Sequence, residues 1–165
     1  MINLKEIEIS PNNPLFSFYQ NKFIVGKSSI KSENFDILVF CIPNVCSVSV
    51  PSFITVIGAY AFSGSEKLEE IEFTANITKI DKYAFCNCQN LKTVDLSKSK
   101  ELKIIEKSAF SGSSIEKIVF PPHLNTIGEY AFYQCKNLRT VENSLNSQLT
   151  TIEEYAFTFS KIVCF

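Results

Sequence analysis

A three-residue motif, Tyr-Ala-Phe, recurs along the chain from residue 60 onward and constrains the fold more than any other feature. Four copies stand at residues 60–62, 83–85, 130–132 and 155–157, and a Ser-Ala-Phe variant stands at 108–110. An isoleucine precedes each copy by three residues. Five copies of one motif indicate a repeat architecture, in which each copy fills the same place in successive structural units.

A second pattern, apolar-x-x-apolar-x-apolar, follows each motif. Leu68, Ile71 and Phe73 form one copy, and the last copy begins at Ile162 and runs off the end of the chain. The pattern also occurs twice upstream, where the Tyr-Ala-Phe motif is missing. The seven copies begin at residues 4, 45, 68, 91, 115, 138 and 162. After a longer first gap, this regular period of about 23 residues predicts a solenoid.

The alternation within the second pattern predicts one short strand per repeat. Successive side chains of a strand point to opposite faces, so Ile71 and Phe73 face one way while Glu70, Glu72 and Thr74 face the other. Parallel stacking of these strands buries the apolar side chains in a continuous core. We expect the Ala-Phe pair to fill this core from the opposite wall, with a brief helical or 3₁₀ turn at each motif.

An additional apolar pair leads into each motif and is expected to form the remaining wall of the core. Its second member is the isoleucine that precedes the motif. The pairs are Ile54 and Ile57, Ile77 and Ile80, Leu102 and Ile105, Leu124 and Ile127, and Leu149 and Ile152.

Two segments carry a resemblance to a known family. Residues 57–64 and 127–138 resemble the BspA-like (Treponema-type) leucine-rich repeats, whose hallmark is Ile-Gly-x-x-Ala-Phe-x-x-Cys-x-x-Leu. The match covers residues 45–165. Residues 10–14, 23–25 and 37–40 are similar to a hairpin-bearing insertion that the family places between two repeats, which accounts for the longer first gap.

The resemblance implies an α/β leucine-rich-repeat solenoid. Its curved parallel sheet of short strands lies on the concave face, and short turns or 3₁₀ or helical segments lie on the convex face. We expect a single domain over residues 1–165. Residues 1–44 form an atypical N-terminal repeat with a β-hairpin insertion, and residues 45–165 form the regular repeats, the last of them truncated.

The resemblance also implies a function. Members of the family are largely cell-surface or secreted proteins implicated in adhesion to host cells and matrix proteins, and the repeat itself has no enzymatic activity. We therefore expect a protein-binding module with a protein partner, at the cell surface or secreted. Residues 1–9 carry charged side chains where a secretory signal needs an apolar run, so a fragment of a longer protein, or a cytoplasmic scaffold, stays open as an alternative.

Composition excludes several other classes. Sixteen Lys and Arg face 17 Asp and Glu, so the net charge of -1 predicts no nucleic-acid partner. The longest apolar run, residues 37–42, is too short to span a membrane. The single histidine, His123, follows two prolines in a loop, and neither a phosphate-binding glycine loop nor a nucleophile motif is present. The sequence predicts neither an enzyme nor a bound cofactor or metal.

The cysteines and one sequon admit two interpretations each. Cys86 and Cys88 have the spacing of a metal or redox pair, but Cys88 and Cys135 occupy the repeat position of Ser65, which favours small core residues. A disulfide between Cys41 and Cys46 stays open. Asn76-Ile77-Thr78 is an N-glycosylation sequon that matters only in an exported protein.

Side chains that point outward from the expected strands define a candidate binding face. They contain six acids and one lysine, which favours recognition of a basic or polar protein surface, although a merely solvated face is the alternative. The candidates are Glu6, Glu8, Ser47, Ser49, Glu70, Glu72, Thr93, Asp95, Lys117, Val119, Thr140 and Glu142.

Overall fold

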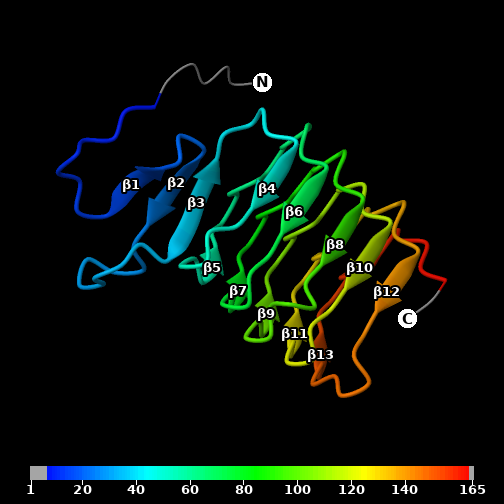
Figure 1. Ribbon diagram of the computed structural model, residues 1–165. Helices are drawn as coiled ribbons and strands as arrows, with labels where there is room; N and C mark the ends of the chain where they lie inside the picture. The colour runs from blue at the N-terminus through cyan, green and yellow to red at the C-terminus, as the bar shows by residue number, and fades with distance from the viewer. Residues whose placement is uncertain (1–6, 164–165) are drawn as a thin grey trace.

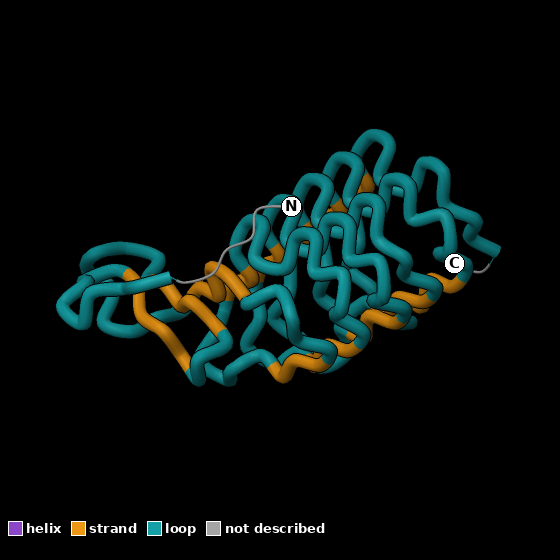
Figure 2. Tube along the Cα trace, turned by 90° about the horizontal axis from the view of Figure 1, so that it is seen from above, coloured by secondary structure: helices purple, strands orange, loops and turns teal. Residues whose placement is uncertain are grey.

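The computed structural model describes residues 7–163, which form a β-solenoid. Successive coils stack side by side along one axis, with the N- and C-terminal segments at its two ends (Figure 1). Two rows of short strands run along the stack, and turns close each coil (Figure 2). The solenoid and its repeat period are as the sequence predicted.

One row contains the strands that the second sequence pattern predicted. They form two parallel ladders, β4 with β6 and β8–β10–β12, in which each strand pairs with its equivalent one repeat later. The strands are β4 (Ser47–Ser49), β6 (Glu70–Glu72), β8 (Thr93–Asp95), β10 (Lys117–Val119) and β12 (Thr140–Glu142).

The other row is a sheet of eight strands that begins with an antiparallel hairpin. β1 (Phe16–Tyr19) pairs with β2 (Phe23–Gly26), and β2 pairs antiparallel with β3 (Ile37–Cys41). From β3 onward the strands are parallel. These are β5 (Val56–Ile57), β7 (Lys79–Ile80), β9 (Ile104–Ile105), β11 (Thr126–Ile127) and β13 (Thr151–Ile152). The apolar pairs that we expected to form the remaining wall therefore lie in and beside paired strands.

The turns at the Tyr-Ala-Phe motifs, which we call the convex turns, differ from the sequence-based expectation. The described residues, 7–163, contain no helix, so the helical or 3₁₀ segments and the α/β class are not confirmed. Backbone hydrogen bonding gives the reason. In the first turn the N–H groups of residues 61, 63 and 65 donate to carbonyl oxygens of the same turn, three residues earlier. Those of residues 60, 62 and 64 donate instead to carbonyl oxygens of residues 82, 84 and 86 in the next coil. A helix would keep all these donors within its own segment.

The first residue of each motif has a left-handed backbone. Its φ angle is 61° at Tyr60, 58° at Tyr83 and 54° at Ser108, with similar values at Tyr130 and Tyr155. This conformation is uncommon for residues other than glycine and interrupts any helix. The inter-coil hydrogen bonds of the same turns hold it in place.

The phenylalanines of the motif form a stack through the core. Neighbouring rings of Phe62, Phe85, Phe110, Phe132 and Phe157 lie nearly parallel, with centroids 4.9 to 5.2 Å apart. The first four rings are fully buried, and so are the alanines beside them. The spacing of the rings matches the separation of paired strands, so each coil adds one ring at the distance that its backbone sets.

The two ends of the solenoid differ from the regular coils. At the N-terminal end, β3 covers the first regular coil, and the Cys41 N–H donates to the Ala61 carbonyl oxygen. In the regular coils the N–H of the motif phenylalanine donates in the same way to the motif alanine of the next coil. Residues 7–9 form no strand, and the rest of the first pattern copy lies outside the described residues. At the other end, Val163 N–H bonds the Arg139 carbonyl oxygen at 2.9 Å without forming a strand. None of residues 7–163 belongs to a helix that could cross a membrane.

The phenylalanine stack provides a stability test. We expect Phe85→Ala to lower the free energy of unfolding by about 3 to 5 kcal/mol, because it removes a fully buried ring between two neighbours. Urea denaturation measures this loss. Phe159→Ala is the control, since that ring is 61% exposed. A loss at Phe85 below about 1 kcal/mol would contradict the assigned packing.

Candidate functional site

Ten of the predicted site residues lie on one exposed surface, which we call the β4–β12 face. Strand pairing aligns them in two rows that run across the coils: Ser47 with Glu70 and Ser49 with Glu72, then Thr93, Lys117 and Thr140 in one row and Asp95, Val119 and Glu142 in the other. Inward residues between these rows, such as Val48, Val94 and Ile118, are buried and fix the direction of their neighbours. Glu6 lies outside the described residues, and Glu8 is exposed but belongs to no strand.

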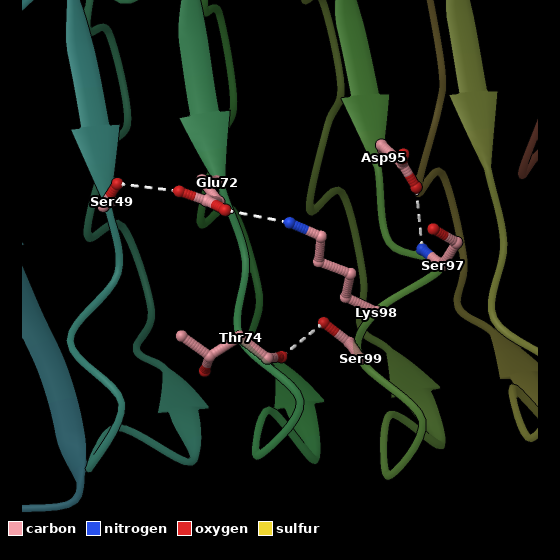
Figure 3. Close-up of polar contacts among 7 residues, drawn as sticks. All are labelled: Ser49, Glu72, Thr74, Asp95, Ser97, Lys98 and Ser99. Carbon is pink, nitrogen blue, oxygen red and sulfur yellow. Dashed lines mark hydrogen bonds and ion pairs between the residues drawn. The ribbon is translucent and has the colours of Figure 1, made fainter.

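Lysines from the loops offset part of the acidity that the strand pattern predicted. Lys98, in the loop after β8, reaches back to Glu72 at the end of β6, with 2.9 Å between Nζ and Oε1 (Figure 3). Ser49 Oγ donates to the other Glu72 carboxylate oxygen at 3.0 Å. Lys98 and then Ser49 lower the pKa of Glu72. Since the pair is exposed, its effect on stability is small, but it neutralises one charge of the face.

Buried contacts hold the loop that presents Lys98. Ser99 is fully buried, and its hydroxyl donates to the Thr74 carbonyl oxygen of the preceding coil at 2.8 Å (Figure 3). Ser97 N–H donates to the Asp95 carboxylate at 2.9 Å, and hydrogen bonding by Ser97 lowers the pKa of Asp95. Asp95 is therefore an ordered, ionised group beside Lys98.

Two further ion pairs lie along the face. Lys117 Nζ is 2.6 Å from Glu142 Oε1 in the next strand, and Lys92 Nζ is 3.5 Å from Glu116 Oε1. Lys92 and Lys98 were missed by the sequence reasoning because they lie just outside the alternating triplets. Their positions next to the strand ends were the only signal.

A groove in the face extends over β4, β6 and β8, and so crosses the place where the two ladders are not joined. Ser47 and Ser49 line it on β4. Its charged lining residues are Glu69, Glu70, Glu72, Lys92 and Asp95. Glu69 and Glu70 form no ion pair within residues 7–163. The groove therefore has polar walls that carry both positive and negative charges, and two of its carboxylates have no lysine or arginine paired with them in residues 7–163.

Cys88 and Cys135 lie in the core rather than in a reactive site. Cys88 Sγ donates to the Phe62 carbonyl oxygen at 3.2 Å, and Cys135 Sγ donates to the Phe110 carbonyl oxygen at 3.1 Å. Burial raises the pKa of Cys88 to about 12 and that of Cys135 to about 11. Cys88 therefore belongs to the column of small buried residues that the sequence favoured, together with Ser65 and Ser113.

The remaining candidates for chemistry are not brought together. Cys41 is buried and Cys46 exposed, and both are free thiols, so the disulfide considered between them is not formed. Burial raises the pKa of the half-buried Cys86 thiol, and no group of His, Cys, Asp and Glu within residues 7–163 could hold a metal ion. His123 is exposed. Asn76 is exposed and donates to the Ser52 carbonyl oxygen at 2.7 Å.

The buried thiols predict a specific pH dependence. In the folded state Cys88 and Cys135 keep most of their protons up to about pH 10, because their pKa values are about 12 and about 11, whereas the unfolded thiols, with an ordinary pKa of 9.0, ionise earlier. The stabilisation is complete below pH 9 and is lost as the pH rises toward the folded pKa values. Between pH 8 and pH 10 we expect the wild type to lose on the order of 2 kcal/mol more unfolding free energy than the variant Cys88→Ser/Cys135→Ser.

Urea denaturation at several pH values measures this difference. Serine suits both positions because Ser65 and Ser113 already occupy the same column in a buried state. Equal pH dependence in the wild type and the double variant would show that the thiols are not protected by burial.

The comparisons with known proteins agree with this geometry. The family model described as "BspA type Leucine rich repeat region" matches residues 28–163 in six copies. No curated protein sequence matches the chain significantly. Solved structures that resemble it share at most 24% identity in the three examples that follow, so their likeness shows the fold alone.

Three bacterial structures illustrate the match. The pneumococcal vaccine antigen PcpA has a TM-score of 0.73 at 20% identity, over 92% of this chain and 46% of that one. The T. pallidum leucine-rich repeat protein TpLRR has a TM-score of 0.76 at 24% identity, over 88% and 68%. A leucine-rich cell surface protein from Faecalibacterium prausnitzii has a TM-score of 0.54 at 17% identity, over 96% and 50%. The chain thus spans about half the length of the pneumococcal structure.

Proposed function

We propose that this chain, which belongs to the BspA-type leucine-rich repeat family, is a non-enzymatic module that binds a protein partner through the β4–β12 face. One observation carries the proposal. Strand pairing aligns exposed side chains in rows across successive coils, while the residues between them are buried in the core or packed against it. Extended surfaces of this kind are the ones that solenoid proteins use for binding.

The charge distribution indicates the kind of partner. Glu69 and Glu70 carry uncompensated negative charge in the groove, while Lys92 and Lys98 limit the acidity around them. A partner surface with basic side chains over the groove and polar side chains elsewhere is complementary to this arrangement.

The finer part of the proposal is a role in adhesion at the cell surface, toward a host-cell or matrix protein. It is supported by family membership and by two structural relatives, one described as a vaccine antigen and one as a cell surface protein. Antibody staining of the source cells, intact and then permeabilised, tests the location, with a known surface protein and a cytosolic protein as controls. Staining of intact cells supports the adhesion role. Staining only after permeabilisation contradicts it and favours an intracellular interaction scaffold.

A charge-reversal variant tests the binding face. Glu70→Lys/Glu72→Lys/Asp95→Lys should weaken binding to immobilised collagen, laminin or fibronectin at least about tenfold, because it reverses the charge of the groove. The control, Glu33→Lys/Glu101→Lys/Glu154→Lys, changes the net charge equally at exposed sites outside the groove. Surface plasmon resonance measures both, and circular dichroism verifies the fold. Equal affinity of the two variants would contradict a role of this face, and binding to none of these matrix proteins would contradict the proposed matrix partner.

A further inference from the structure

A second hollow lies at a different place, where the convex turns pass into the next strands. Its lining is formed by carboxamide, hydroxyl and ammonium side chains and contains no carboxylate. Gln89 Nε2 donates to the Gly112 carbonyl oxygen at 2.7 Å, and Ser114 Oγ donates to Gln89 Oε1 at 3.5 Å. The lining residues are Asn87, Gln89, Gly112, Ser113, Ser114, Gln134, Lys136 and Asn137.

One repeat position that lines the hollow changes its side chain from coil to coil. This position has a left-handed backbone throughout, with φ of 59° at Asn87, 67° at Gly112 and 56° at Gln134. Gly112 contributes no side chain between the other two, and a Cβ atom there would collide with Asn87 Oδ1. The Asn87 carboxamide therefore reaches to Gly112, into the space that a side chain at residue 112 would otherwise fill, and Gln134 holds the same position one coil further on.

In the last coil the same position holds Phe159. Its φ is 65°, a strained backbone for a bulky side chain where the other coils use glycine, asparagine and glutamine, and its ring is 61% exposed. The ring meets Tyr133 edge to face, with centroids 5.5 Å apart. Gln134, which follows Tyr133 and lines the hollow, donates its N–H to the carbonyl oxygen of Thr158, the residue before Phe159. Tyr133 and Phe159 are thus neighbours of the lining residue Gln134, although neither ring lines the hollow itself.

We propose that the polar hollow and the Tyr133–Phe159 pair together bind an acidic sugar unit of a glycan. An exposed aromatic ring stacks against the C–H face of a pyranose, and carboxamides supply both donors and acceptors for its hydroxyl groups. Lys136 is the only charged side chain of the lining and forms no ion pair within residues 7–163. Its ammonium matches the carboxylate of a uronic acid.

The two hollows share no lining residue, so the lining of each can be changed by substitution without replacing a residue of the other.

Titration with a hyaluronan octasaccharide, followed by NMR chemical shifts of the full chain, tests the proposal. Phe159→Gly is the main variant, because Gly64 and Gly112 show that glycine fits this backbone with φ of 68° and 67°. It should fold as stably as the wild type and bind the octasaccharide about tenfold more weakly. Lys136→Gln should also bind more weakly, and Lys67→Gln, an exposed lysine outside the hollow, should bind as the wild type does.

Neutral chitohexaose is the matched probe for charge. The proposal requires that it bind more weakly than hyaluronan, since it offers no carboxylate to Lys136. The absence of hyaluronan binding, equal affinity of wild type and Phe159→Gly, or equal affinity for the two glycans would each overturn it. The variant with Glu70, Glu72 and Asp95 reversed should keep hyaluronan binding, so failure of the protein-binding proposal is separable from failure of this one.

Discussion

The backbone hydrogen bonding of the convex turns is the constraint on which the rest of the structure depends. Along each turn the N–H groups alternate between two kinds of acceptor. One donates to a carbonyl oxygen of the same turn, as at Ala61, and the following one donates to a carbonyl oxygen of the next coil, as at Phe62. The inter-coil bonds fix the coil separation, and with it the roughly 5 Å spacing of the stacked Phe85 and Phe110 rings. The left-handed Tyr83 makes this alternation possible, because it turns the chain before a helix can form.

Once the coil separation is fixed, every repeat position becomes a column. A column of identical residues, such as the motif phenylalanines, forms continuous packing. A column of mixed residues creates local features instead: Asn87, Gly112 and Gln134 line the polar hollow, and Phe159 adds an exposed ring one coil further on. The outward columns of the strands form the rows of the β4–β12 face. The proposed binding surfaces therefore consist of side chains that differ between coils, presented by a backbone that repeats regularly.

The sequence predicted the features that depend on periodicity. The strand that contains Ile71, the buried Phe85 and the small buried Cys88 all follow from apolar spacing and from equivalence between repeats. The convex turns could not be predicted, because the choice between a helix and inter-coil bonding depends on donors and acceptors that lie a full repeat apart in the sequence. The pairing of Lys98 with Glu72 was missed for a similar reason, because the loop that carries the lysine belongs to one coil and the glutamate to the coil before it.

Native-state hydrogen exchange tests the central role of inter-coil bonding most directly. The amides of Phe85 and Phe110 donate to the next coil from the middle of the stack, so they should exchange only through cooperative unfolding, among the slowest in the protein. The amide of Leu145, whose side chain is fully exposed in a loop, should exchange rapidly. Exchange at Phe85 and Phe110 as fast as at Leu145 would contradict the account.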